Sequence, residues 1–443
     1  MSLPRYSEYK DSGVEWLGEV PGHWDVAPLK RGYEVVLGKM LQNDASSPDD
    51  ELVPYLRAAN IKWDGVDISD VKQMWISPRE SKQLALRVGD LLISEGGDVG
   101  RSSIWQDELE ACYFQNSVNR ARSKNGNSTR FLYYWISAIK DVGFIDIICN
   151  KSTIAHFTAE KVAAVPVPFP TPEEQQTITA FLDRETGKID ALISEQRRLV
   201  ELLAEKRQAV ISHAVTKGLN PNARMKDTGI EWLGEVPEHW DVKRIKFVID
   251  SVKAGPFGSA LTKDVYVSTG YRVYGQEQVI PNDFTIGDYF ISPEKYEELS
   301  QYSVLPGDIL ISCVGTFGKI AIIPSNIEPG IINPRLIRVR CSDAIKAEYL
   351  VEVMRSNVTF EQFTSFTRGG TMDVINIGTL NEILIALPPM EEQGALQGLL
   401  HCETAKFDTL TAEANRAIAL LQERRSALIS AAVTGKVDVR EAA

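Results

Sequence analysis

The residues whose types could do chemistry are few, and their spacing argues against a catalytic centre. Gly315-Thr316-Phe317-Gly318-Lys319 suggests a phosphate-binding loop, but it lacks the four-residue gap and the following Ser or Thr that such loops need. The five histidines show no metal-ligand spacing, and the chain has no Gly-x-Ser-x-Gly elbow. Two interpretations of the 315–319 turn stay open: a β-turn that closes a strand, and a turn that touches a nucleic-acid phosphate.

The five cysteines also argue against a metal or redox centre. No two of them form a C-x-x-C pair, and their number is odd. A zinc site or a disulfide framework is therefore not supported. We predict reduced, mostly buried thiols and no metal.

Composition and charge narrow the class further. The chain has 443 residues, 44% of them apolar and 24% charged, as in a folded globular protein. It shows no apolar run of the ~18 residues that span a bilayer and no signal-peptide layout at its start, so we expect a cytoplasmic protein. The net charge of −12 argues against coating nucleic acid through bulk charge, but not against local basic surfaces.

The elements that position these residues are arranged as an internal repeat. Gly13-Val14-Glu15-Trp16-Leu17-Gly18-Glu19-Val20-Pro21 recurs 216 residues later, and Gly89-Asp90-Leu91-Leu92-Ile93-Ser94 and Glu173-Glu174-Gln175 recur 218 residues later. Such matches indicate two tandem halves. Residues 27–170 and 243–387 share only scattered positions. This pattern is typical of one scaffold that presents two different readers.

Each half ends in a stretch that reads as one long helix. The first stretch, residues 171–218, begins with Pro172, which is followed by Glu173 and Glu174, and it stops at Gly218. The second long helical stretch ends at Gly435. Heptad spacing of apolar residues predicts a seam on both helices. The seam residues are Leu182, Ile189, Leu192, Leu199, Leu203, Val210, Leu400, Phe407, Leu410, Leu421 and Leu428. Helices of roughly 45 residues are about 65–70 Å long, so we expect them to pack on each other rather than each on its own globular half.

The segments before the helices read as short strands, glycine-rich turns and short helical pieces at 129–140 and 346–357. We therefore predict an α+β fold. Two globular domains are separated and joined by two long helices, which pack as an antiparallel coiled coil in a pseudo-two-fold tandem repeat. The predicted boundaries are 1–170 and 219–387 for the globular domains, 171–218 for the central helix and 388–443 for the C-terminal helix and tail.

Binding to DNA is the function class that the variable segments favour. They are nearly neutral, with net charges of −1 (27–170) and −2 (243–387), so most of the acidity lies in the scaffold. They also carry side chains that donate to base edges and phosphates. The candidates for contact with DNA are Arg57, Asn60, Lys62, Arg101, Asn119, Arg120, Arg122, Lys124, Lys151, Arg272, Tyr274, Gln276, Gln278, Lys319, Arg335, Arg338, Arg340 and Arg368.

The order of variable domain, long helix, variable domain and long helix resembles the specificity (S) subunit of type I restriction-modification systems. The resemblance rests on residues 13–21 with His23-Trp24, on Gly307-Asp308-Ile309-Leu310-Ile311-Ser312, on Glu391-Glu392-Gln393 after Pro388-Pro389, and on Ala432-Val433-Thr434-Gly435-Lys436. It covers nearly the whole chain. It implies that each globular domain is a target-recognition domain that reads one half of a bipartite DNA site, while the helices set the spacer.

The resemblance also implies partners and cofactors. Two modification (methyltransferase) subunits would dock on the helices, bind S-adenosylmethionine and methylate adenine. Restriction (helicase-nuclease) subunits would cut unmodified double-stranded DNA with ATP and magnesium. This chain would itself hold no catalytic residue, metal or cofactor, and it would contact no membrane.

Two other hypotheses belong to different classes. One is a coiled-coil structural or interaction scaffold that does not bind DNA, and salt-dependent binding to duplex DNA distinguishes it from a reader. The other, weaker one is a nucleotide-dependent enzyme that uses the 315–319 turn. Unchanged nucleotide binding after Lys319→Ala would dispose of it.

Overall fold

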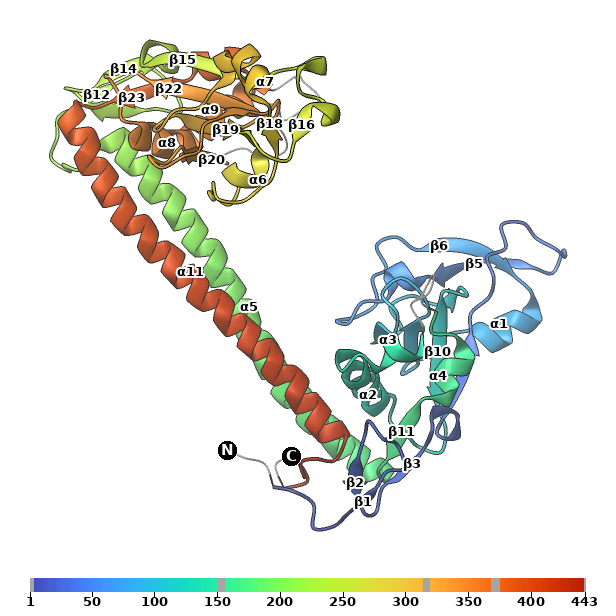
Figure 1. Ribbon diagram of the computed structural model, residues 1–443. Helices are drawn as coiled ribbons and strands as arrows, with labels where there is room; N and C mark the ends of the chain where they lie inside the picture. The colour runs from blue at the N-terminus through green and yellow to red at the C-terminus, as the bar shows by residue number, and fades with distance from the viewer. Residues whose placement is uncertain (1–3, 150–155, 314–318, 368–374, 442–443) are drawn as a thin grey trace. The chain divides into compact units, whose positions relative to one another are not determined.

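The computed structural model describes residues 4–149, 156–313, 319–367 and 375–441. They form two compact units: unit 1 contains residues 1–197 and 416–443, and unit 2 contains residues 198–415. The borders between the units fall inside two long helices, α5 (Pro172–Lys217) and α11 (Met390–Val433). Each unit therefore holds one globular part and one stretch of each helix (Figure 1). In the part of the chain described, no helix is long and apolar enough to cross a membrane.

The globular part of unit 1 is built on two sheets. The main sheet is antiparallel, with strand order β4-β10-β7-β8. Its strands are β4 (Tyr33–Leu37), β10 (Val118–Ser123), β7 (Leu91–Ser94) and β8 (Ser102–Ile104). The second sheet, β6-β5-β9, pairs β5 (Glu51–Leu56) antiparallel to β6 (Lys72–Ile76) and parallel to β9 (Tyr113–Phe114).

Helix α2 (Thr129–Asp141) supplies most of the core against the main sheet. Ser128 starts it by accepting a hydrogen bond from the amide of Phe131, and nine consecutive residues from Phe131 to Ile139 are buried. All of them except Ser137 share one apolar cluster with Leu91 and Ile93 of β7. The remaining helices of unit 1 are α1 (Pro78–Leu84), α3 (Phe144–Ile148), α4 (Ala159–Ala164), η1 (Leu29–Arg31) and η2 (Ala58–Asn60).

Unit 2 repeats this arrangement. Its main sheet, β15-β22-β19-β20, has the same order and the same antiparallel pairings. The strands are β15 (Ile249–Ala254), β22 (Leu336–Cys341), β19 (Ile309–Ser312) and β20 (Ile320–Ile322). The second sheet, β16-β18-β17-β21, again has one parallel pair, between β17 and β21. Its strands are β16 (Tyr266–Val267), β18 (Phe290–Ile291), β17 (Tyr271–Tyr274) and β21 (Gly330–Ile332).

The helices of unit 2 also follow the repeat, and α8 packs on its main sheet against β20, as α2 does against β8. They are α6 (Gln276–Val279), α7 (Pro293–Glu298), α8 (Ala347–Arg355), α9 (Asn357–Thr367), α10 (Ile377–Glu382), η3 (Ile245–Phe247), η4 (Gly258–Leu261), η5 (Lys263–Val265) and η6 (Ser300–Tyr302). The predicted α+β tandem repeat is thus confirmed.

Two-stranded ribbons join each globular part to its helix. In unit 1 they are β1 (Tyr9–Asp11) with β2 (Glu19–Pro21), and β3 (Asp25–Pro28) with β11 (Pro166–Phe169). In unit 2 they are β12 (Met225–Asp227) with β13 (Glu235–Pro237), and β14 (Asp241–Arg244) with β23 (Leu384–Leu387). The strands β11 and β23 lead directly into α5 and α11.

The repeated Glu-Glu-Gln motif fastens the start of each long helix. Gln175 is fully buried, accepts from the amide of Ser128 at 2.8 Å and donates to the Pro170 carbonyl at 3.0 Å. Gln393 does the same with Lys346 (2.8 Å) and Pro388 (2.9 Å). Ser128 and Lys346 directly precede α2 and α8. One glutamine therefore ties the start of α5 to the start of α2 in unit 1, and the start of α11 to the start of α8 in unit 2.

The glutamate before each of these glutamines binds the preceding ribbon. Glu174 lies 2.8 Å from Nε2 of His23 and accepts from the Tyr6 hydroxyl at 2.9 Å. Glu392 lies 2.9 Å from Nε2 of His239 and accepts from the Trp240 indole at 2.9 Å. A carboxylate in the first turn of a helix is also stabilised by the helix dipole.

The two long helices run antiparallel within each unit. In unit 1, Arg425 donates to Asp190 at 2.8 Å, and Leu182 shares a core cluster with Ala432. In unit 2, Arg207 lies 3.6 Å from Asp408. The two ion pairs occupy equivalent positions of the repeat, because both of their members are related by the 218-residue offset.

The burial of the predicted seam residues corrects part of the heptad assignment. Leu182, Ile189, Leu203 and Leu400 are buried, and Val210, Phe407, Leu421 and Leu428 are half-buried. Leu192, Leu199 and Leu410 are instead 46%, 42% and 47% exposed. The inward positions lie one residue later, at Ile193, Val200 and Thr411. Within a heptad, the two inward residues are thus four residues apart, as Ile189 and Ile193 are, rather than three.

Candidate nucleic-acid interface

Arg122 and Arg340 are only partly exposed, and each is tied to its main sheet by a buried carboxylate. Arg122 donates twice to the buried Asp90, at 2.7 and 2.6 Å, and Arg340 donates twice to the buried Asp308, at 2.8 Å each. The same carboxylates accept the backbone amides of the turns that precede β7 and β19. These hydrogen bonds raise the pKa of Arg340. Both pairs are framework contacts.

Arg120 and Arg338 are buried even more deeply, with exposures of 1% and 4%. Arg120 donates to Glu34 at 2.8 Å and to the Gln83 carbonyl at 2.9 Å, while Arg338 donates to the Ser303 carbonyl. Burial lowers the pKa of both guanidinium groups, and the neighbouring Arg122 or Arg340 lowers it further. Neither side chain reaches the surface of the free chain.

Asn60 and Gln278 shape the turn that follows the central strand of each second sheet. The Asn60 side chain accepts from the amide of Arg57 at 3.0 Å and donates to the Asp67 carbonyl at 2.8 Å. The Gln278 side chain accepts from the amide of Gly275 at 2.8 Å and donates to the Ile286 carbonyl at 3.0 Å. Both are buried, so their amides are committed to the turn.

Three further candidates are also committed to internal contacts. Asn119 is fully buried and donates to the Phe157 carbonyl at 2.8 Å. Arg272 donates to Glu328 at 2.7 Å, which raises the pKa of Arg272 and lowers that of Glu328. The buried Tyr274 donates to the Glu328 carbonyl at 2.8 Å.

The repeat itself contains a signal for part of this framework. Arg120, Arg122 and Asp90 recur as Arg338, Arg340 and Asp308 at the 218-residue offset. If the two units recognise different DNA sequences, the residues that they share are expected to support the fold, and the residues in which they differ are expected to set the sequence preference. No such signal marks Asn119, Arg272 or Tyr274.

The candidates that reach the surface in unit 1 gather mostly at one end of the main sheet. Arg101 donates to the Ala58 carbonyl at 2.8 Å, and the amide of Ala58 donates to the Ser117 hydroxyl at 3.1 Å. Arg57, which pairs with the exposed Asp70, and Lys62 flank this point and are half-buried. We call residues 57–62, 94–101 and 115–117 the turn end of unit 1. Lys124 is exposed at the opposite end of β10 and is not part of it.

The turn end of unit 2 consists of the equivalent residues 275–278, 312–313, 319 and 333–335. Gln276 donates to the Ser312 hydroxyl at 2.6 Å, and Gln276 and Arg335 line one cleft of about 640 Å³. The side chain of Lys319 is exposed. The backbone carbonyl of Lys319 accepts from the amide of Ser312 at 3.0 Å, and the carbonyl of the equivalent Arg101 accepts from the amide of Ser94 at 2.8 Å. Residues 315–318 of the predicted turn, Lys151 and Arg368 lie outside the described residues.

Sequence reasoning missed part of this cleft. Lys263, Tyr266, Tyr289 and Asn333 line it together with the two candidates. The tyrosine rings lie 5.0 Å apart, and Asn333 accepts the amide of Arg335 at 2.9 Å. Tyrosine hydroxyls, amides and cations beside a cleft can donate to base edges and phosphates. The only sequence signal was the Asn-Pro turn at Asn333.

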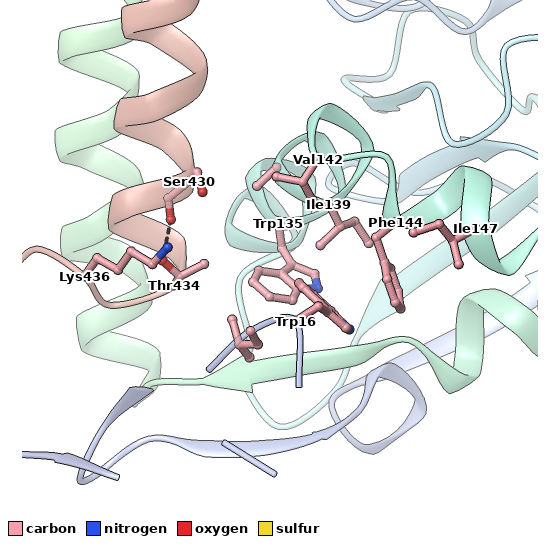
Figure 2. Close-up of a pocket in the computed structure, with 11 residues that line it drawn as sticks. Trp16, Trp135, Ile139, Val142, Phe144, Ile147, Ser430, Thr434 and Lys436 are labelled. Carbon is pink, nitrogen blue, oxygen red and sulfur yellow. Dashed lines mark hydrogen bonds between the residues drawn. The ribbon is translucent and has the colours of Figure 1, made fainter. Parts of the chain in front are cut away.

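A different hollow in unit 1 is apolar. Trp16 lies with its ring centroid 4.3 Å from that of Phe144 and 5.8 Å from that of Trp135, and Figure 2 shows these rings beside Ile139 and Ile147. On the far side are Ser430 of α11, Thr434 just after the end of α11, and Lys436. The Thr434 hydroxyl donates to the Ser430 carbonyl at 2.7 Å. This hollow offers few donors or acceptors for bases, unlike the turn ends.

The thiols and acidic side chains form no reactive centre within the described residues. No group of three or more His, Cys, Asp or Glu residues there has the geometry to hold a metal ion. All five cysteines are free, and Cys112, Cys149 and Cys313 are buried. Burial raises the pKa of Cys112 and Cys341 to about 12, which disfavours the thiolate at neutral pH.

Comparison with known proteins identifies the family of the chain. The family described as type I restriction modification DNA specificity domain matches residues 33–202 and again 237–404. The type I restriction enzyme MjaVIII specificity subunit of Methanocaldococcus jannaschii is 23% identical over 95% of this chain and 94% of its own length. The EcoKI specificity subunit of Escherichia coli strain K12 is 20% identical over 95% of this chain and 90% of its own.

A solved structure described as showing the structural basis of complex assembly and conformational transition of the type I R-M system has the same fold. Its TM-score is 0.65 at 16% identity, over 94% of this chain and 98% of the other. With two family matches that together cover most of its length, the chain belongs to the type I restriction-modification DNA specificity subunits, the non-catalytic members that define which DNA sequence is recognised.

Proposed function

We propose that each unit reads one half of a bipartite, asymmetric DNA sequence through its turn end. The observation that carries this proposal is the contrast between a shared framework and a different surface. The Arg–Asp pairs at the opposite end of the main sheets are the same in both units. At the turn ends, Arg57, Arg101 and Ser117 of unit 1 are replaced by Gly275, Lys319 and Arg335 in unit 2.

The residues proposed to touch DNA follow from exposure. They are Arg57, Lys62, Arg101, Gln276, Lys319 and Arg335 at the turn ends, and the exposed Lys124 at the other end of β10. Lys151 and Arg368, which lie outside the described residues, stay candidates on their residue type alone. Buried Asn60, Asn119, Arg120, Tyr274, Gln278 and Arg338, together with Arg122, Arg272 and Arg340, are proposed to support the folded framework from which the turn ends project. Hydrogen bonds to base edges give the sequence information, and contacts with phosphates fix the position on the duplex.

The division of labour along the chain is also proposed. Residues 1–170 and 219–387 form the target-recognition domains, and residues 171–218 and 388–443 form the helices that set the spacer. The helices dock two modification subunits, which bind S-adenosylmethionine and methylate adenine. Restriction subunits add cleavage that requires ATP and magnesium, and the assembly works in the cytoplasm. The similarities give no support to a scaffold that does not bind DNA.

A domain exchange tests the two-reader proposal. The chain is co-expressed with its modification subunits, and residues 27–170 are replaced by the corresponding segment of another family member. Methylation-aware sequencing of host DNA should show that one half-site changes while the other half-site and the spacer stay the same. A change in both half-sites would contradict the assignment of one half to each unit.

A further inference from the structure

Met40 and Phe257 are two apolar side chains that the fold leaves in solvent. Their exposures are 75% and 71%, and among the described large apolar residues only Ile147 is comparably exposed. A single exposed apolar residue is ordinary on a protein surface. These two differ because they occupy the same position in both units.

The equivalence follows from the strands. Gly38 and Gly255 come directly after β4 and β15, the equivalent edge strands, and Met40 and Phe257 each lie two residues further on. The amide of Gly38 donates to the Val118 carbonyl at 3.1 Å, and that of Gly255 donates to the Leu336 carbonyl at 2.9 Å. Val118 and Leu336 are related by the 218-residue offset.

The chain is held closely against its neighbour two residues before each of these side chains. A Cβ atom on Gly38 would overlap the Gln115 carbonyl, and one on Gly255 would overlap the Asn333 carbonyl, so the chain crosses there at the closest approach that glycine permits. In unit 1 the next residue, Lys39, donates its amide to Phe114 at 3.1 Å and accepts from Asn116 at 2.9 Å. The exposed side chain therefore starts from a fixed backbone, which lowers the entropy lost on binding.

The crossing places both side chains at the turn ends. Residues 115–117 and 333–335, which the glycines touch, belong to the turn ends of unit 1 and unit 2. In unit 2, Leu261 and Lys263, which follow Phe257, line the cleft that contains Gln276 and Arg335. An exposed apolar residue thus follows directly, along the chain, the point where the backbone meets the turn end, whose donors and acceptors suit base edges.

We propose that Met40 and Phe257 are specificity-determining residues that contact bases of the half-site read by their own unit. This inference rests on the proposed function, because it needs the turn ends to face DNA. The ligand chemistry is apolar: the 5-methyl group of thymine in the major groove, or the face of a base at a step that the side chain opens. Two readers would then use one fixed position with a different side chain, a flexible thioether in one and a flat ring in the other.

The test uses the complete assembly with its modification subunits and a duplex that carries the methylated site. Met40→Ala and Phe257→Ala should each lower the affinity for this duplex about 10-fold or more, as truncation of base-contacting apolar groups does. On a duplex in which the half-site of the same unit is scrambled, the variant and the unchanged chain should bind with equal affinity. The matched controls are Ile147→Ala (72% exposed, in α3) and Phe247→Ala (64% exposed, at the other end of β15), and both should bind like the unchanged chain.

Modified duplexes distinguish the two contacts. If the side chain contacts a thymine methyl group, uracil in place of that thymine should lower the affinity of the unchanged assembly as much as the alanine variant does. If the side chain instead opens a base step, 2-aminopurine at that step should become more fluorescent with the unchanged chain and not with the variant. If the unchanged assembly binds no specific duplex, the proposed function fails. If it does bind one and both variants bind as tightly, or if the controls lose as much, the role of Met40 and Phe257 fails while the proposed function stands.

Discussion

At the scale of the residue, an arginine in this chain serves either the framework or the surface, and burial of the arginine itself or of its carboxylate partner distinguishes the two. Asp90 is 1% exposed and Asp308 is 2% exposed, and each accepts two hydrogen bonds from its arginine. Arg101 and Arg335, by contrast, have no buried acidic partner among the described residues. The two kinds of arginine should respond differently to the same substitution.

Arg122→Ala should lower the stability of the chain rather than its sequence preference. Removal of one partner of a buried ion pair leaves a charge without compensation and costs about 3–5 kcal/mol. Thermal unfolding should therefore show a clear fall in the midpoint, and Arg340→Ala should act alike in unit 2. Lys124→Ala, an exposed control on the same strand end, should leave the midpoint unchanged. Equal midpoints for Arg122→Ala and Lys124→Ala would show that the Asp90 pair does not support the fold.

At the scale of the element, the first turn of each long helix is the joint on which the globular part depends. Gln175 and Gln393 are fully buried, and each bonds both its own helix start and the start of a second helix. The joint is therefore a specific set of hydrogen bonds rather than a general apolar contact.

Gln175→Ala should loosen this joint in unit 1. It leaves the amide of Ser128 and the carbonyl of Pro170 without their partner, and each unsatisfied buried group costs about 1–3 kcal/mol. Hydrogen exchange should rise at the start of α2 and of α5 while the interior of unit 2 keeps its protection, and Gln393→Ala should give the converse result. The exposed neighbour Gln176 provides the control Gln176→Ala. Uniform loss of protection in both units would contradict a local joint.

The long helices were predictable from sequence because their signals are local. Pro172 and Gly218 mark the ends, and α5 spans Pro172–Lys217. The inward face was predicted less well: leucines at 192 and 199 suggested a spacing of three, but Ile193 and Val200 lie inside. The polar Thr186 and Arg207 hid the true register, since a polar residue at a seam position weakens the apolar pattern. The sheets were not predictable, because β10 pairs with β4 and β7 from distant parts of the sequence.

The proposed ruler role of the helices makes a quantitative prediction. Seven residues inserted after Gln196 of α5, with seven matching residues in the facing stretch of α11, add about 10 Å of helix. At 3.4 Å per base pair, the spacer of the methylated site should lengthen by about three base pairs, while both half-sites stay the same. Insertion in α5 alone should abolish methylation, because Asp190–Arg425 and Arg207–Asp408 can no longer form in one register. An unchanged spacer after the paired insertion would disprove the ruler.

At the scale of the whole molecule, the net charge of −12 decides how the chain meets DNA. Phosphates repel such a chain at a distance, and its variable segments, with net charges of −1 and −2, are the parts that carry least of this repulsion. The surface cations at the turn ends are few: Arg57, Lys62 and Arg101 in unit 1, and Lys319 and Arg335 in unit 2. The chain can therefore supply sequence information with little of the electrostatic affinity.

The isolated chain should accordingly bind its own site weakly, and the assembly with modification subunits should bind it much more tightly. Affinity measured against salt reports the number of phosphates neutralised, with a slope of about −0.9 per contact on a log–log plot. Few cations on this chain imply a shallow slope for the chain alone and a steep one for the assembly. Arg101→Ala and Lys319→Ala should each reduce the slope of the assembly by about one if they contact phosphates, and should leave it unchanged if they contact bases. A steep slope and tight binding by the isolated chain would show that the turn ends carry the phosphate contacts themselves, and the acidity of the scaffold would then have no bearing on the need for partners.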